Sequence, residues 1–250
     1  MSRVLVTGAA RRIGAAIARA LAADGWHVVV HYHGSADAAE TLASEIVAAG
    51  GRCTTIGADL ADPDAVGSLI PACIARFGPL DALVNNASNF RYDTVHSMDR
   101  AGWNDHLEPN LAAPVFLAQA FAAACQGRPG NIVNMLDHKV AALNPDFFSY
   151  TITKSAMAGA TRVLAMALAG TAIRVNGIAP GIALPSGKQT QAGFERAWTA
   201  PPLGRSCTPA ELADACRFIL ATSSLNGQIL ILDGGDSLLA RSRDVAFEAT

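Results

Sequence analysis

RVLVTGAARRIG, residues 3–14, is the stretch that decides the fold. Its first part, 3–7, is a valine-rich apolar run that is typical of a buried parallel strand. A turn from Gly8 to Gly14 follows, and then a segment with helical periodicity that stops at Gly25. Strand, glycine turn and helix in this order predict a dinucleotide-binding loop, in which Gly8 permits the tight turn and Gly14 lets the helix approach the sheet. The helix N-terminus would face a pyrophosphate.

The rest of the chain alternates between short apolar runs and helical patterns. Further strands are expected near 28–32, 53–56, 82–85, 131–135, 174–178 and 228–232, and helices near 37–49, 63–76, 102–126, 150–169 and 209–221. This alternation predicts one α/β domain over residues 1–250, a Rossmann fold with a doubly wound seven-stranded parallel sheet and helices on both faces. Ligands of such folds bind at the carboxyl ends of the strands.

The segment after the second strand bears on the choice of cofactor. An acidic residue near its end would bind the ribose 2′-hydroxyl of NAD, and none is present. Arg12, His33 and Ser35 instead offer a cation and hydrogen-bond donors to a 2′-phosphate, so NADP(H) is favoured over NAD(H). His31 and His33 resemble half a metal site, but no carboxylate or cysteine cluster accompanies them, and no metal site is predicted.

A second motif, YTITK, places Tyr150 and Lys154 four residues apart on one helix face. An ammonium beside a phenol favours the ionised phenol, so we expect Lys154 to lower the pKa of Tyr150 and make it a usable acid. Asp137 lies thirteen residues before Tyr150 in the sequence. A carboxylate there can accept from N–H groups or carry a proton; the alternative is a structural pairing of Asp137 with His138 or Lys139.

From Val4 to about Leu238 the chain resembles the short-chain dehydrogenase/reductase family. The matching motifs, in order, are TGAARRIG at 7–14, ADL at 58–60, NNAS at 85–88, EPNLAAP around Asn110, YTITK at 150–154, RVNGIAPG at 174–181 and LDGG at 232–235. Within the family the chain looks most like the pteridine reductases. That likeness rests on Arg12 in the glycine loop, Asp137 in place of the usual serine, Phe90 in NNASNF and the segment HYHGS.

The resemblance implies roles for the catalytic positions. Tyr150 would donate a proton, Lys154 would hold the nicotinamide ribose, Asn110 would support a water that relays protons to Lys154, and Asp137 would hydrogen-bond Tyr150 and the substrate. Cofactor contacts are implied at Gly8, Arg12, Ile13, Gly14, His33, Ser35, Asp59, Leu60, Asn86, Ala87, Ser88, Tyr150, Lys154, Pro180, Gly181 and Ile182. Substrate contacts are implied at Ser88, Phe90, Asp137 and Tyr150, and the segment 181–208 is expected to add Leu184 and Trp198. Gly34 departs from relatives that carry arginine there, which implies a looser grip on the 2′-phosphate.

Two segments near the C-terminus lack core periodicity. Residues 181–208 are rich in Gly, Pro and Ser, with a short helical piece at 191–199, and are interpreted as a substrate-covering lid. Leu184, Phe194 or Trp198 would form its apolar wall, although Trp198 is equally well explained as an anchor that holds the lid down. The tail 241–250 is polar and expected to fray; in relatives it can reach a neighbouring subunit's site.

Bulk properties narrow the partners to small molecules. With 51% hydrophobic residues, 16% charged residues and a net charge of −2, the chain has no basic surface for nucleic acid or an anionic membrane. Its apolar helical stretches are too short or too polar to span a membrane. The five cysteines form no CxxC pair, which favours reduced thiols and a cytoplasmic location. Helices that are apolar on two faces, together with the family resemblance, predict a homotetramer.

The leading functional hypothesis is an NADPH-dependent reductase of a dihydropteridine or dihydrofolate. A carbonyl reductase of the 3-oxoacyl or sugar type on the same scaffold is the alternative enzyme. A non-catalytic NADP(H)-binding regulator is a third interpretation, which the presence of Asn110, Tyr150 and Lys154 disfavours.

Overall fold

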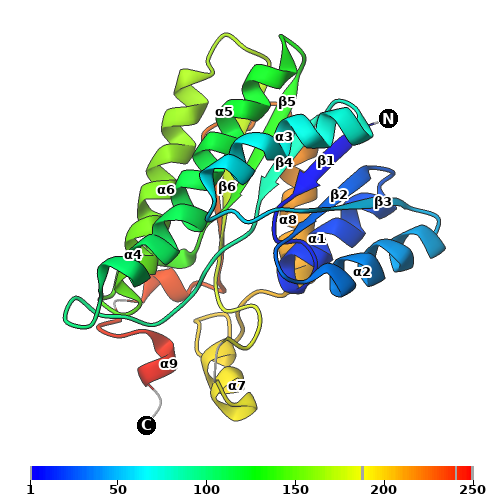
Figure 1. Ribbon diagram of the computed structural model, residues 1–250. Helices are drawn as coiled ribbons and strands as arrows, with labels where there is room; N and C mark the ends of the chain where they lie inside the picture. The colour runs from blue at the N-terminus through cyan, green and yellow to red at the C-terminus, as the bar shows by residue number, and fades with distance from the viewer. Residues whose placement is uncertain (1, 187–188, 240, 249–250) are drawn as a thin grey trace.

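The computed structural model describes residues 2–186, 189–239 and 241–248. Its centre is a seven-stranded, wholly parallel sheet with the order β3-β2-β1-β4-β5-β6-β7 (Figure 1). The strands are β1 (Arg3–Val6), β2 (His27–Tyr32), β3 (Arg52–Gly57), β4 (Ala82–Asn85), β5 (Gly130–Met135), β6 (Ile173–Pro180) and β7 (Ile229–Leu232). The predicted doubly wound parallel sheet is confirmed.

Helices cover both faces of the sheet because alternate strand residues point to opposite sides. In β1, Val4 and Val6 belong to the core under α1 (Arg12–Ala23), α2 (Ala36–Ala48) and α8 (Pro209–Ala221). Leu5 belongs to the opposite core, under α3 (Pro63–Phe77), α5 (Ala113–Cys125) and α6 (Phe148–Ala167). The strands are therefore buried on both faces, as their continuous apolar runs require.

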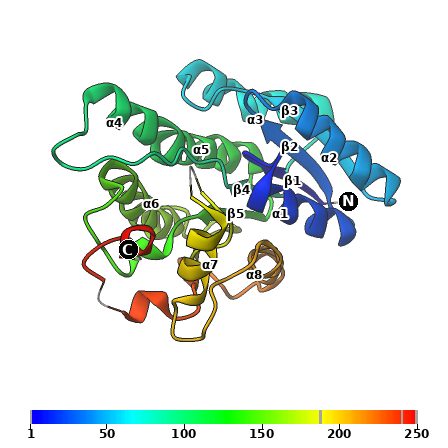
Figure 2. The same ribbon diagram turned by 90° about the horizontal axis from the view of Figure 1, so that it is seen from below.

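The strand order reverses at β1, which pairs with β2 on one side and with β4 on the other. Loops that leave these neighbouring strands part in opposite directions and open a crevice at the carboxyl edge of the sheet. Figure 2 views the molecule from this edge, where α7 (Gln191–Thr199) and α9 (Val245–Glu248) lie beside each other. These two helices belong to the predicted lid and to the C-terminal tail.

The helix predicted at 102–126 is interrupted by one π turn. The chain forms α4 (Arg100–Leu107), then the π turn η1 (Glu108–Ala112), then α5. Pro109 has no N–H to donate to the carbonyl of Asp105, which disrupts the α-helical pattern. That carbonyl instead accepts from Nδ2 of Asn89 at 3.0 Å. The expectation of one continuous α-helix is wrong at this turn, and the turn is where Asn110 lies.

Short helical turns complete the framework near the crevice: η2 (His138–Val140) follows β5, and η3 (Asp236–Leu238) follows β7. Across the described parts of the chain, none of the helices combines the length and the apolar character that crossing a membrane demands.

Candidate functional site

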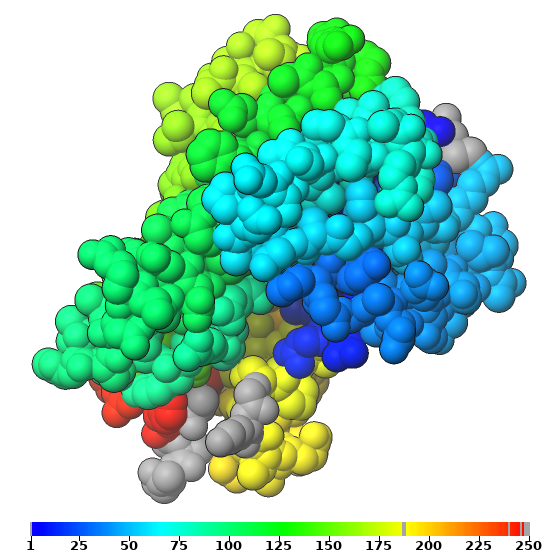
Figure 3. Space-filling model, in the orientation of Figure 1, coloured from blue at the N-terminus to red at the C-terminus, as the bar shows by residue number. Residues whose placement is uncertain are grey.

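A cavity of about 690 Å³ lies at the carboxyl edge of the sheet, between the glycine loop, the loop after β4, the Asp137 turn and the lid. In the space-filling view it opens as a hollow between the blue N-terminal part and the green middle of the chain, above the yellow lid (Figure 3). Most of the residues predicted for the site line it: Gly8, Arg12, Ile13, Gly14, His33, Asp59, Leu60, Asn86, Ala87, Ser88, Phe90, Asp137, Tyr150, Lys154, Pro180, Gly181, Ile182 and Leu184. Ser35, Asn110 and Trp198 are not among the lining residues.

The glycine loop requires its glycines for close packing. Gly8 has φ of 59°, and a Cβ there would lie 2.8 Å from Cα of Ala87. A Cβ on Gly14 would lie 2.6 Å from Nδ2 of Asn86, which donates to the carbonyls of Thr7 at 2.9 Å and Gly8 at 3.1 Å. Both glycines therefore have the packing roles that the sequence predicts, and Asn86 holds the loop from β4.

His31 supports the same loop and was not predicted to do so. Its Nδ1 accepts from the N–H of Gly8 at 3.1 Å, and its Nε2 lies 3.1 Å from the carbonyl of Ala58. Burial lowers the pKa of His31 to about 4, so the ring is neutral at pH 7 with its proton on Nε2. The described residues contain no His, Cys, Asp and Glu cluster suited to a metal. A polar residue in a buried strand was the only sequence signal for this role.

The N-terminus of α1 fits an anionic pyrophosphate. No side chain caps its first N–H groups, and its first turn carries no acidic residue. The positive end of the helix dipole and these free donors face the cavity edge, where Arg11 and Arg12 are exposed. The loop therefore has the donors and the space for a dinucleotide phosphate, and Arg11 is a second cation that sequence reasoning passed over.

Two of the three residues predicted to hold a 2′-phosphate, Arg12 and His33, line the cavity and have protein neighbours there. Arg12 has φ of 56°, and its Nη1 donates to the carbonyl of Pro185 in the lid at 2.8 Å. His33 lines the cavity with its Nδ1 3.7 Å from Oδ1 of Asp59, while Ser35 lies outside the lining. Arg12 is thus engaged with the lid, and His33 stays as the donor at the end of β2.

Tyr150 and Asp137 form the hydrogen bond that the sequence predicts. The phenol Oη donates to Oδ2 of Asp137 at 2.8 Å. The other carboxylate oxygen, Oδ1, accepts from the backbone N–H of Lys139 at 2.9 Å and lies 3.8 Å from Nε2 of His138. One oxygen of Asp137 therefore serves the turn η2, as the structural interpretation expects, and the other accepts from Tyr150, the contact that the functional interpretation requires.

The protonation of Tyr150 differs from the expectation. Burial raises the pKa of Tyr150 well above its ordinary value, and the neighbouring carboxylate of Asp137 raises it further. Nζ of Lys154 donates to the carbonyl of Met135 at 2.8 Å and lies 5.6 Å from the Tyr150 ring centroid. Burial lowers the pKa of Lys154 to about 8. The expected lowering of the Tyr150 pKa by Lys154 is wrong for this structure, and Tyr150 keeps its proton at neutral pH.

Asn110 is a positioning residue in this structure. Its Oδ1 accepts from the N–H of Asn89 at 2.7 Å and from Oγ of Ser88 at 3.1 Å. Its Nδ2 donates to the carbonyl of Asn89 at 2.9 Å and to Oγ1 of Thr153 at 3.3 Å. The side chain is buried with its hydrogen bonds satisfied, so it fixes the loop after β4, and the water relay expected at Asn110 stays a prediction.

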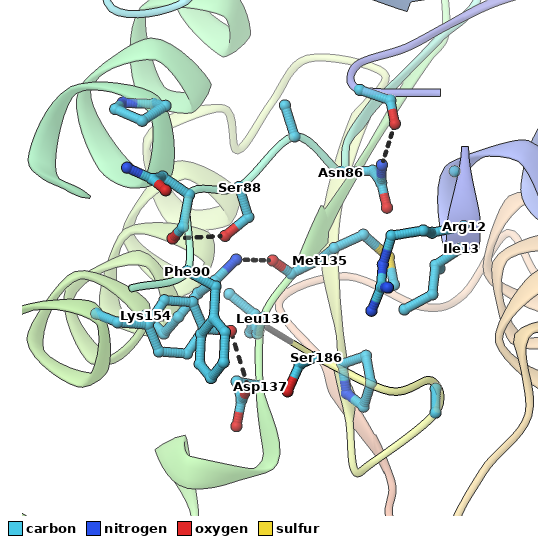
Figure 4. Close-up of a pocket in the computed structure, with 18 of the residues that line it drawn as sticks. Arg12, Ile13, Asn86, Ser88, Phe90, Met135, Leu136, Asp137, Lys154 and Ser186 are labelled. Atoms are coloured by element: carbon cyan, nitrogen blue, oxygen red, sulfur yellow. Dashed lines mark hydrogen bonds between the residues drawn. The ribbon is translucent and has the colours of Figure 1, made fainter. Parts of the chain in front are cut away.

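An aromatic group forms the substrate end of the cavity. Phe90 stacks on Phe147 with ring centroids 4.3 Å apart and meets Tyr150 edge-on at 4.7 Å. Figure 4 shows Phe90, Asp137 and Lys154 grouped together, with Arg12 across the cavity. Phe147 was missed, although its position one helical turn before Tyr150 was a usable signal. Flat stacked rings of this kind favour a flat ligand.

The lid and the tail bear on several expectations. Nε1 of Trp198 donates to the carbonyl of Cys207 at 3.0 Å, which supports the interpretation of Trp198 as an anchor of the lid, while its substrate contact stays a prediction. Leu184 lines the cavity as expected. Of the tail expected to fray, residues 241–248 are described and are instead held down, because Arg243 binds Asp146, and Asp244 and Val245 line the cavity; residues 249–250 lie outside the described residues.

Comparisons with known proteins agree with this geometry. The family model described as Enoyl-(Acyl carrier protein) reductase matches residues 8–237. A 3-oxoacyl-[acyl-carrier-protein] reductase of Staphylococcus aureus is 34% identical over 237 residues, which cover 92% of this chain and 96% of that protein. Pteridine reductase 1 of Leishmania tarentolae is 34% identical over 276 residues, covering 94% and 96%. The chain therefore belongs to the short-chain dehydrogenase/reductase family and is an oxidoreductase of that family.

Among solved structures, the chain is similar to FolM alternative dihydrofolate reductase 1 from Brucella canis, which was crystallised with NADP. The identity is 43%, the TM-score is 0.92, and the match covers 97% of this chain and 96% of the other. The Brucella suis protein, also in complex with NADP, gives the same identity and TM-score.

Proposed function

We propose that this protein is an NADPH-dependent reductase of a pterin, acting on a C=N bond of a dihydropteridine or dihydrofolate. The observation that carries the proposal is the 2.8 Å hydrogen bond from Oη of Tyr150 to Oδ2 of Asp137, beside the stacked rings of Phe90 and Phe147. A carboxylate at this place accepts from the N–H groups of an amino-pyrimidinone edge, whereas a carbonyl substrate offers none. The likeness to the Brucella reductases supports the same substrate class.

The chain's own residues account for the proton and for the position of the substrate. Bound NADPH supplies a hydride to the ring carbon. Tyr150, held protonated by burial, gives its proton to the adjacent ring nitrogen. Asp137 orients that phenol and, by its charge, disfavours a lasting phenolate. Lys154, fixed on the carbonyl of Met135, supplies the nearby positive charge that offsets the developing anion.

The cofactor of this proposal is NADP(H). The uncapped N-terminus of α1 and the close packing at Gly8 and Gly14 support a bound pyrophosphate. The proposed contacts of the 2′-phosphate are His33, with Arg12 or Arg11 as the cation, since all three line the cavity. Asp59 and Leu60 lie at its adenosine end after β3.

Assembly and location extend the proposal. Phe116 on α5 and Val163 and Met166 on α6 are 57%, 62% and 75% exposed, which supports association through this helical face and a homotetramer. All five cysteines are free thiols, which suits the cytoplasm. Measuring the mass in solution and testing Met166→Glu for loss of assembly would check the first point.

The deciding experiment compares three substrates with the same purified protein. NADPH oxidation is followed with a dihydropterin, with dihydrofolate and with a 3-oxoacyl thioester. We expect turnover of the pterin-type substrates and little turnover of the thioester. Turnover confined to the thioester would overturn the substrate class and favour the carbonyl-reductase alternative, which the similarity to the Staphylococcus aureus protein keeps as the second candidate.

A further inference from the structure

Two segments far apart in the sequence meet at the substrate end of the cavity. One is the active-site turn, 137–147, and the other is the C-terminal segment, of which residues 233–239 and 241–247 are described. Side chains of basic and acidic residues meet along this contact. Nδ1 of His138 lies 3.5 Å from Oδ2 of Asp236, and Nζ of Lys139 lies 2.7 Å from Oδ2 of Asp244. Such a series of contacts is specific, because it requires both segments to hold one register.

The strongest of these contacts joins Asp146 and Arg243. Oδ2 of Asp146 accepts from Nε of Arg243 and Oδ1 from Nη2, both at 2.8 Å, which is the bidentate geometry of a strong pair. The Asp146 side chain is only 3% exposed and also accepts from the N–H of Asp244 at 2.8 Å. Hydrogen bonding by Arg243 holds the pKa of Asp146 below its usual range. This buried carboxylate therefore serves as the attachment point of the tail.

The second contact reaches the catalytic carboxylate. Lys139 is 3% exposed and divides its ammonium between Oδ2 of Asp244 and Oδ1 of Asn144, both at 2.7 Å. Its own backbone N–H donates to Oδ1 of Asp137. A buried ammonium needs its carboxylate partner, because without it the buried positive charge would be uncompensated and the side chain would leave this position. Asp244 consequently fixes Lys139, and through its backbone the orientation of Asp137.

Aromatic packing continues the same wall. Phe247 lies 5.0 Å from the Tyr92 ring and 6.0 Å from the Phe147 ring, measured between centroids. Val245 is buried and lines the cavity. Phe147 itself has φ of 54°, a conformation unusual for a bulky residue, so neighbouring contacts must hold it there. The Asp146 attachment directly precedes it in the chain.

We propose that the segment from Arg243 to Phe247 closes the substrate end of the cavity within its own chain, and that Arg243 and Asp244 are positioning residues for Phe147 and Asp137. The proposal rests on the proposed pterin reduction. Arg243 fixes the strained Phe147 and hence the stacking surface for the substrate ring. Asp244 fixes Lys139 and hence the carboxylate that orients the proton donor.

The test compares Arg243→Ala and Asp244→Asn with the control Arg217→Ala. Arg217 also makes a bidentate pair, with Asp24 at 2.6 Å, but it joins α8 to the end of α1 away from the cavity. We expect Arg243→Ala to raise KM for the dihydropterin roughly tenfold and Asp244→Asn to lower kcat roughly tenfold, as small misplacements of reacting groups do. The Kd of NADPH, read by its fluorescence, should stay within about twofold, and Arg243→Lys should recover part of the KM.

The outcomes separate the inference from the proposed function. Unchanged pterin kinetics in Arg243→Ala and Asp244→Asn would overturn the inference while leaving pterin reduction in place. Equal losses in pterin and NADPH binding, or a kinetic loss in Arg217→Ala as well, would reduce the effect to general stability and also overturn it. A wild-type protein that reduces no dihydropterin would overturn the proposed function itself. If Arg243→Ala does not fold, the isosteric Asp244→Asn and the conservative Arg243→Lys carry the test.

Co-expression tests whether the tail acts within its own chain. Tyr150→Phe chains retain the tail, and Arg243→Ala chains retain the proton donor. A tail that served a neighbouring subunit would restore activity in mixed oligomers, because some sites would combine both intact parts. We expect no activity beyond the sum of the separate variants, and recovery above that sum would contradict closure in the same chain.

Discussion

The two ends of the cavity are held by different kinds of contact. Around the glycine loop the supporting groups are neutral: the His31 ring, the Asn86 amide and backbone carbonyls. At the substrate end they are ionic, with Lys139 on Asp244 and Arg243 on Asp146. Because these hydrogen bonds involve no charged groups, the electrostatic field at the glycine loop comes mainly from the helix dipole. The positive end of that dipole suits an anionic ligand. Paired charges hold a turn firmly while leaving the carboxylate of Asp137 directed at Tyr150.

Removing the proton donor should produce the largest loss of activity among these predictions. The loss should be limited to the substrate end of the cavity. Tyr150→Phe is expected to lower kcat by about 10²-fold or more, the usual loss of a positioned acid. NADPH binding should be unchanged, because the glycine loop is supported from other residues. Single-turnover kinetics together with NADPH fluorescence would measure both. An unchanged kcat would remove Tyr150 from the mechanism.

The pH dependence of kcat/KM should show the titration of the Lys154 ammonium at the substrate end of the cavity. Burial lowers the pKa of Lys154 from 10.5 to about 8, so its positive charge is lost as pH rises through that value. We expect kcat/KM to fall about tenfold per pH unit above about 8. Between about 8 and 10.5 the unfolded chain binds the extra proton, so the contribution of Lys154 to stability rises over the window in which activity falls.

Lys154→Arg is the matched control for this profile, because a guanidinium does not titrate in the range. Its activity, whatever its height, should show no fall near pH 8. A fall that persists in Lys154→Arg would assign the titration to another group.

Replacing the carboxylate should separate the two candidate substrate classes. Asp137→Ser replaces the charged carboxylate acceptor for ring N–H groups with a weaker neutral hydroxyl near Tyr150, so we expect pterin reduction to lose about tenfold more than carbonyl reduction. Steady-state kcat/KM for a dihydropterin and a 3-oxoacyl thioester would show the ratio. Equal losses on both would mean that Asp137 serves only the turn η2.

The smallest expected effect lies at the cofactor end. His31→Ala leaves the Gly8 N–H without its acceptor, which costs about 1–3 kcal/mol and should weaken NADPH binding more than pterin binding at saturating NADPH. His27→Ala, on the same strand and bonded through Nε2 to Thr54 at 3.1 Å, is the control. Thermal unfolding and NADPH titration would compare the two. Equal effects would show that His31 supports the strand and not the loop.

The same contrast explains what the sequence could predict. The glycine loop and the sheet come from local motifs and periodicity, and the Tyr150–Asp137 pair from the YTITK motif together with the resemblance to the pteridine reductases. Asp146 and Arg243 lie 97 residues apart, and nothing near either one signals the other. The rise in the Tyr150 pKa also escaped prediction, because its largest cause is burial, which no local motif reveals.

The π turn Glu108–Ala112 sets how far α5 is rotated about its axis relative to α4. It takes up one residue more than an α-helical turn would, and α5 begins only afterwards with Leu117 and Phe121 turned into the core. Deleting one residue here would rotate α5 by about 100° relative to α4, since each residue of an α-helix advances by that angle. The buried face of α5 would then point elsewhere, so the five-residue turn is needed for Leu117 and Phe121 to reach the core.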